Sequence, residues 1–118
     1  MKPSETLPIF KEAQRLSSLI VETSSKAPKP YRYTLISRLI NLSLDLIGFI
    51  DTANRDVNTR IGVLLKASAT IQKIKTLVFI SVDSRCFSLN ASALIIKSIE
   101  KISEHLDRWI QYSKERSS

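Results

Sequence analysis

The chain has 118 residues, of which 43% are hydrophobic and 25% are charged. This length and composition are typical of one globular domain and exclude a disordered chain or two ordinary domains. Only two glycines occur, which argues against all-β folds and phosphate-binding loops because their turns need glycine. The net charge of +7 favours a polyanionic partner such as nucleic acid, although such a charge also serves solubility alone.

Cysteine content and the N-terminus indicate where the protein works. The single cysteine, Cys86, excludes an internal disulfide and a thiolate metal cluster, which fits a reducing compartment. The segment Met1–Glu5 lacks the apolar core of a signal peptide, and no apolar run approaches the roughly 20 residues that span a bilayer. We therefore expect a cytoplasmic protein without a membrane partner.

The spacing of apolar residues predicts the fold. Apolar residues recur at intervals of three and four, the period of one helix face, along four segments, about residues 7–25, 31–54, 57–82 and 88–114. Lys26–Pro30 is expected to be a loop because prolines lack an amide donor. Thr76–Val82 is β-branched and aromatic, but we expect a helix there because no partner strand occurs elsewhere. The sequence predicts one all-α domain over residues 1–118, an antiparallel up-down-up-down four-helix bundle.

The second predicted helix is apolar over much of its circumference. Its apolar residues form one stripe with flanking isoleucines, namely Leu35, Leu39, Leu42, Leu46, Phe49 and Ala53 with Ile36, Ile40, Ile47 and Ile50. Such a wide arc has to bury a second surface. With no membrane signal, we expect a second subunit to cover it, which predicts a homo-oligomer.

Residues suited to catalysis are few. The only histidine, His105, is interpreted as a partly exposed surface residue, and Cys86 as a small apolar filler. No glycine-rich phosphate loop and no His-x-x-x-His pair occurs in the sequence. Trp109 is interpreted as a core or interface plug. We therefore expect no enzyme activity, cofactor or metal, and an enzyme would require a composite site between subunits.

Positive charge gathers in the middle of the sequence. No acidic residue occurs within residues 26–38 or 57–82, so the second and third helices are expected to present a basic side. Lys66 and Lys73 are one heptad apart on one helix face and span about 10 Å, which suits a phosphate backbone. The candidate phosphate contacts are Lys26, Lys29, Arg32, Arg38, Arg60, Lys66, Lys73 and Lys75.

Two tyrosines flank one of these basic residues. Tyr31 and Tyr33 lie on either side of Arg32, where their rings could stack on unpaired bases. The interpretation we favour is that both rings pack the mouth of the bundle.

Several short segments resemble a known family. Lys29–Leu35, Arg38–Ile40, Leu44–Ile47 and Ile102–Trp109 resemble the four-helix bundle proteins that include Avd, the accessory protein of diversity-generating retroelements. The related ribosomal intervening-sequence proteins carry an Asn-Ile-Ala-Glu-Gly type of signature, which is absent here, with Asp51–Asn54 in its place. The sequence is thus more similar to the Avd-like branch.

The resemblance implies a basic four-helix protomer that assembles into a cyclic pentamer, associates with a reverse transcriptase and binds nucleic acid. Arg32 and Arg38 match basic residues of that family, and Trp109 matches a structural position. The predicted partners are therefore DNA or RNA, a reverse transcriptase, and copies of the chain itself. The alternative is a protein-only scaffold or adaptor whose charge serves solubility, in which case reversing the basic residues would leave partner binding intact.

Overall fold

The computed structural model describes residues 2–117, and every regular element within that range is helical. Four helices are long, namely α1 (Pro8–Ser24), α3 (Ser37–Arg55), α4 (Arg60–Asp83) and α5 (Leu89–Ser117). Three are short, namely the 3₁₀ helix η1 (Ser4–Thr6), α2 (Lys29–Tyr31) and the π-helix η2 (Arg32–Ile36). The all-α prediction is confirmed, and the β-branched run before Asp83 is helical.

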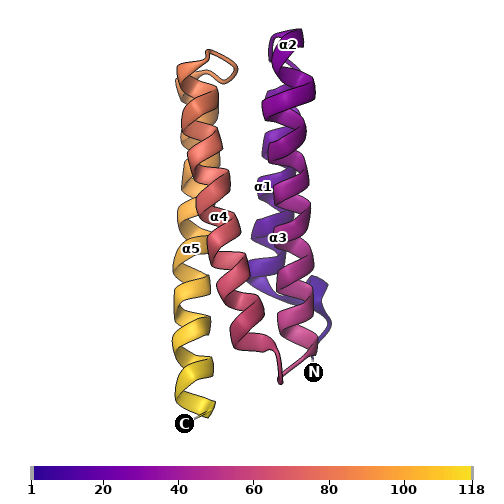
Figure 1. The fold of residues 1–118 in the computed structure, drawn as a ribbon, viewed down its shortest axis with the longest axis vertical. Helices are drawn as coiled ribbons and strands as arrows, with labels where there is room; N and C mark the ends of the chain where they lie inside the picture. Colours follow the sequence, from indigo (N-terminus) through magenta and orange to yellow (C-terminus); the bar gives the residue numbers. More distant parts are fainter. Residues whose placement is uncertain (1, 118) are drawn as a thin grey trace.

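The long helices lie side by side in an elongated body that measures 48 × 21 × 21 Å (Figure 1). α3 packs against α4, α4 against α5, and α1 against both α3 and α5, so the four helices surround one core. Figure 1 shows α2 and the α4–α5 connection at one end of this body. The α3–α4 connection, η1 and the end of α5 lie at the other end, where η1 packs against α1 and α3.

The second helix begins earlier than the sequence predicts. α2, η2 and α3 form one continuous helix from Lys29 to Arg55. Pro28 occupies its N-cap and Pro30 its first turn, where an amide would have no partner within the helix in any case. The predicted loop over Lys26–Pro30 is therefore wrong at its end, because Lys29 and Pro30 already belong to the helix.

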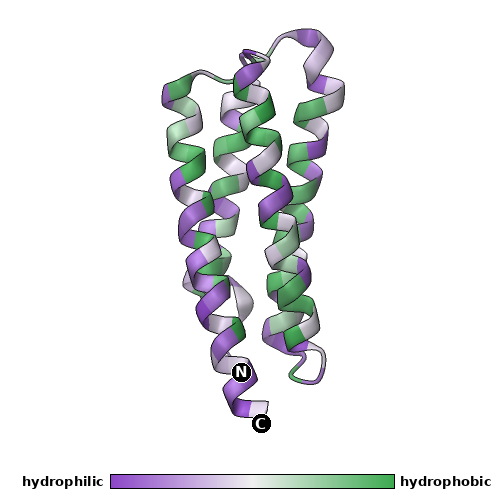
Figure 2. Ribbon diagram, turned by 60° about the vertical axis from the view of Figure 1, so that its left-hand side comes forward, coloured by the Kyte–Doolittle hydropathy of each residue, from purple (hydrophilic) through white to green (hydrophobic). Residues whose placement is uncertain are grey.

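The core consists of the apolar residues that the helical spacing predicts. Each long helix turns one buried stripe inward, and Figure 2 shows these hydrophobic residues on the facing sides of the helices. The buried stripes include Ile9, Ala13, Leu16 and Ile20 of α1, Leu64, Ala67, Ile71, Ile74 and Val78 of α4, and Ile95, Ile99, Ile102 and Leu106 of α5. The last predicted position of that final stripe, Trp109, is half-buried.

Most of the wide apolar arc of the second helix packs inside the protomer. Ile36 and Ile50 are buried, Ile40 and Ile47 are half-buried, and Leu44 is 56% exposed. By length and composition this helix is also apolar enough to cross a membrane, which corrects the expectation that no segment would qualify. The core helix of a bundle meets the same criteria. Every residue of the predicted arc is buried or half-buried, and the exposed Leu44 lies outside that arc.

Candidate nucleic-acid interface

Arg32, a predicted phosphate contact, holds the connection between α1 and α2. Its Nε donates to the carbonyl of Ala27 at 3.0 Å, and its Nη2 donates to the carbonyl of Ser25 at 3.1 Å. These bonds satisfy the carbonyl of the C-cap residue of α1, Ser25, and a carbonyl of the loop that follows it. Part of the Arg32 guanidinium is thus committed to the loop, and a substitution there would change the loop as well as the surface charge.

Arg60 has the same role at the opposite end of the molecule. Its Nε donates to the carbonyl of Ala53 at 2.6 Å and its Nη2 to the carbonyl of Asn54 at 3.1 Å, both in the last turn of α3. A cation is favourable there because the unpaired carbonyls give the helix C-terminus a partial negative charge. Ala53, which Arg60 contacts, lies about 36 Å along the second helix from Lys29 by the rise of 1.5 Å per residue, so the predicted contacts do not form one cluster.

Arg38 and Lys73 are brought together from different helices. They line one hollow of about 380 Å³ between α3 and α4, whose other residues are Leu42, Gln72, Thr76 and Leu77. Both cations are exposed, and within residues 2–117 neither has an ion-pair partner. Lys66 is also exposed, one heptad from Lys73 on the same face of α4. We call Arg38, Lys66 and Lys73 the α3–α4 basic strip.

One carboxylate lies close to this strip. Asp45 is exposed and follows Arg38 by one heptad, so the two residues share a face of α3. In the described part of the chain Asp45 has no ion-pair partner. Its charge opposes that of the strip, which makes it the natural site for a substitution that strengthens the positive potential.

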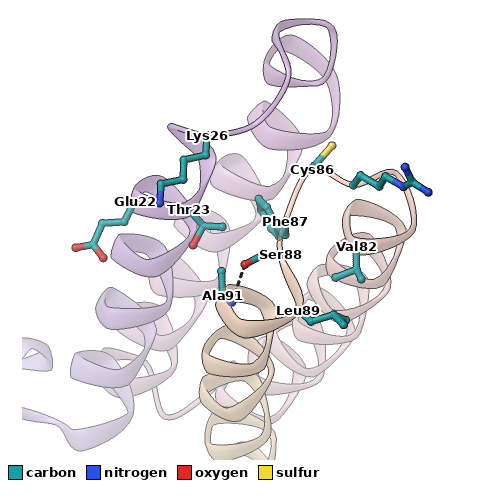
Figure 3. Close-up of a pocket in the computed structure, with 10 residues that line it drawn as sticks. Glu22, Thr23, Lys26, Val82, Cys86, Phe87, Ser88, Leu89 and Ala91 are labelled. Carbon is teal, nitrogen blue, oxygen red and sulfur yellow. Dashed lines mark hydrogen bonds between the residues drawn. The ribbon is translucent and has the colours of Figure 1, made fainter.

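Lys26 lines a separate hollow of about 610 Å³ beside the α4–α5 connection. Figure 3 shows Lys26 and Glu22 on one side of it and Phe87 and Ser88 on the other. The Glu22 carboxylate in the same lining makes the hollow less favourable for phosphate. Cys86, at the same connection, is buried, and this burial raises the pKa of its thiol, as expected of a small filler.

The remaining predicted contacts lie apart from the strip. Lys29 is exposed at the start of the second helix. Lys75 is half-buried and, two residues after Lys73, points about 200° around α4 from it. Of the two tyrosines, Tyr31 packs against the core as predicted, whereas Tyr33 is 81% exposed within the π-helix. The prediction that both rings pack at the mouth is therefore wrong for Tyr33.

A second basic and aromatic group lies at the end of the molecule that carries the termini. It surrounds a hollow of about 460 Å³, the end hollow, lined by Leu7, Pro8, Ile9, Asn54, Arg60, His105, Arg108, Trp109 and Tyr112. From the sequence, His105 and Trp109 are interpreted singly, and Arg108 and Tyr112 are not predicted to belong to a site. The signal that could have found them is their spacing of three, one and three residues, which places all four on one face of α5.

Hydrogen bonds fix the wall of the end hollow that the N-terminal segment forms. The hydroxyl of buried Ser4 donates to the carboxylate of Asp51. The side-chain amide of Asn54 donates to Ser4 Oγ at 3.1 Å and to the carbonyl of Lys2 at 2.8 Å. These bonds hold η1 against the C-terminal turns of α3, so the residues that follow η1 close one side of the hollow.

Burial changes the chemistry of His105 in this hollow. Desolvation lowers the pKa of its imidazole below the ordinary value of 6.5, and the positive charge of Arg108 lowers it further. His105 is therefore a half-buried ring that is mostly neutral at pH 7, and its partial exposure agrees with its interpretation as a partly exposed surface residue. Among residues 2–117, no group of three or more His, Cys, Asp or Glu is placed to hold a metal ion.

Comparison of the chain with models of known protein families and with curated proteins finds no match in either case. Its function is therefore inferred from the arrangement of its own residues.

Proposed function

We propose that this protein is a non-catalytic accessory protein that binds nucleic acid through the α3–α4 basic strip. The observation that carries the proposal is that Arg38 and Lys73, from different helices, line one hollow without a carboxylate partner in the described part of the chain. Cations held unpaired on a rigid scaffold keep their charge available for phosphates. Neutralising phosphates with lysine and arginine supplies most of the affinity of sequence-independent nucleic-acid binding.

The strip has the dimensions of a backbone contact. Lys66 and Lys73 are about 10 Å apart along α4 by the helical rise, and successive phosphates in one strand of a duplex advance about 3.4 Å along its axis. The pair therefore spans about three phosphates, with Arg38 beside Lys73. Contacts to phosphates carry no direct sequence information, so we expect the proposed binding to have little sequence preference.

The larger architecture belongs to the same proposal. We infer an antiparallel up-down-up-down bundle that associates with copies of itself, because the four helices have short connections and several large apolar side chains are about half exposed: Val21, Leu44, Leu65, Phe79 and Leu94. A ring of copies would repeat the strip and raise the affinity for a long strand through multivalency. The resemblance to Avd-like proteins adds a cyclic pentamer, a cytoplasmic location and a reverse transcriptase as partner.

A protein-only scaffold is the second candidate, and the outer face of α4 favours it. Leu65, Phe79 and Ile80 are exposed there, and a Cβ added at Gly62 would meet no atom within 4 Å. An apolar face with open space beside it suits another protein chain. In that case the charge of the strip would affect solubility and not partner binding.

Salt dependence separates the two candidates. Fluorescence anisotropy of the purified protein with labelled single-stranded and duplex DNA and RNA, at low and high salt, measures it directly. Three phosphate contacts predict that affinity falls about 20- to 40-fold between 50 and 200 mM salt. Absence of binding at low salt, or an affinity that salt does not change, would contradict the proposal and leave the scaffold as the better account.

A further inference from the structure

The lining of the end hollow is positively charged and has no compensating acid. Its nine residues include Arg60 and Arg108 but neither aspartate nor glutamate. The Arg108 side chain is exposed and, within residues 2–117, makes no hydrogen bond or ion pair. Arg60 uses its Nε and one donor of its Nη2 on carbonyls of α3, which leaves its other donors unused. Guanidinium groups that line a partly apolar hollow favour an anion there, and the carboxylates beside Arg108, those of Glu12 and Glu104, line the adjoining hollow and not this one.

Aromatic rings form another part of the lining. Trp109 is half-buried there, with the Arg60 guanidinium carbon 6.0 Å from the centre of its ring. Tyr112, one turn further along α5, is 56% exposed and has the guanidinium of Arg116 5.4 Å from its ring centre. Leu7 and Pro8 complete the apolar side. Such a surface suits a flat ring, since aromatic and guanidinium planes both stack on bases.

The volume of the end hollow and the hydrogen-bonding groups in its lining further restrict the class of ligand that it can bind. The volume of about 460 Å³ lies within the range of roughly 300–1,000 Å³ that small-molecule sites occupy. Half-buried His105 offers one donor and one acceptor as a neutral imidazole, and Asn54 retains a free amide oxygen. A ligand with one flat polar ring and one anionic group would use every part of this lining.

We propose that the end hollow binds one nucleoside monophosphate unit, either free or as an unpaired nucleotide of a single strand. The base stacks against Trp109 and Tyr112, and the phosphate is held by Arg108. The lining of the end hollow is the evidence that the ligand is an aromatic anion. The choice of a nucleotide among such anions rests on the proposed function of nucleic-acid binding.

Trp109 makes this proposal directly testable, because it is the only tryptophan of the chain and its fluorescence reports on stacking in the hollow. The 118-residue protein is titrated with adenosine and uridine monophosphates, a trinucleotide, inorganic phosphate and benzoate. We expect saturable quenching by the nucleotides, at concentrations at least tenfold lower than for phosphate or benzoate. Arg108→Ala should weaken nucleotide binding at least tenfold, whereas Arg15→Ala, which removes an exposed arginine of α1, should leave it unchanged.

Two further measurements identify the source of the nucleotide and distinguish binding in the end hollow from binding at the α3–α4 basic strip. A trinucleotide that binds much more tightly than a mononucleotide indicates a single strand, and equal affinities indicate a free nucleotide. The variant Arg38→Glu/Lys66→Glu/Lys73→Glu should retain mononucleotide quenching even if it loses long strands. The proposal is overturned if nucleotides do not quench saturably, if Arg108→Ala binds like the wild type, or if phosphate or benzoate binds as tightly as a nucleotide.

Discussion

The guanidinium carbon of Arg60 lies 6.0 Å from the centre of the Trp109 ring, while its Nε donates to the carbonyl of Ala53. One side chain at the start of α4 therefore contacts both the end of α3 and the C-terminal half of α5. It fixes the α3–α4 connection and at the same time forms part of the lining of the end hollow. Arg60 therefore both stabilises the fold and belongs to the proposed binding site.

Replacing Arg60 should destabilise the fold. We expect Arg60→Ala to lower the free energy of unfolding by about 1–3 kcal/mol, because it removes two charge-assisted hydrogen bonds and a cation–π contact. Urea denaturation measures the change. Arg55→Ala is the control, because its ion pair with Asp51 is 65% exposed on the arginine side and such pairs are worth about 0–1 kcal/mol. Equal effects of the two substitutions would show that the carbonyl contacts of Arg60 add nothing.

The turn after α4 stores backbone strain at Arg85. This residue has a φ of 62°, and around it Cys86 donates to the carbonyl of Ser81 at 2.8 Å and Arg85 to that of Val82 at 3.0 Å. These bonds form the Schellman motif, whose left-handed position favours glycine. Arg85→Gly should raise the free energy of unfolding by about 1 kcal/mol in a thermal or urea melt. Ser84→Gly, at a φ of −82°, should give no such gain, and a loss on Arg85→Gly would refute this account of the turn.

His105 should titrate below its ordinary pKa. It is the only histidine, so its imidazole proton signals in an NMR titration can be assigned without ambiguity. We expect a midpoint below 6.5, because desolvation and the charge of Arg108 both disfavour the protonated ring. Arg108→Ala should move the midpoint upward. A midpoint at or above 6.5 in the wild type would contradict the burial of His105 in the end hollow.

The same shift has a consequence for stability. Because the folded pKa lies below the unfolded one, the unfolded chain binds more protons below pH 6.5, so this group destabilises the fold as pH falls through that window. His105→Gln removes the effect while the carboxylates still titrate. The wild type should therefore lose more stability than His105→Gln between pH 7 and pH 5 in urea melts.

Local patterns in the sequence predict the four long helices, but they do not predict the role of Arg60 or the end hollow. The spacing of apolar residues identifies the four long helices and their buried stripes because every helix faces one common core. It misplaces the start of the second helix, since Pro30 reads as a breaker and yet fits a first turn. The role of Arg60 was missed because its carbonyl partners lie six and seven residues back across a turn. The end hollow was missed because Leu7, Arg60 and Arg108 meet only in the folded chain.

Removing the one carboxylate near the α3–α4 basic strip should strengthen nucleic-acid binding. Asp45 is exposed on the face of α3 that carries Arg38. We expect Asp45→Lys to tighten binding several-fold at low salt and to steepen its salt dependence, since the substitution adds a phosphate contact. Anisotropy titrations measure both quantities. Glu100→Lys, an equal charge change at an exposed position of α5, is the control, and an equal gain from it would point to net charge and not to the strip.

The most direct test of the central claim compares two variants of equal net charge. The strip variant is Arg38→Glu/Lys66→Glu/Lys73→Glu, and the control is Lys11→Glu/Arg15→Glu/Lys97→Glu on exposed positions of α1 and α5. Arg32 and Arg60 are left intact because they hold the connections. Circular dichroism first confirms that both variants fold, and anisotropy then measures nucleic-acid binding. We predict that the strip variant loses at least tenfold more affinity than the control; equal losses, or no loss, would contradict the α3–α4 basic strip as the binding surface.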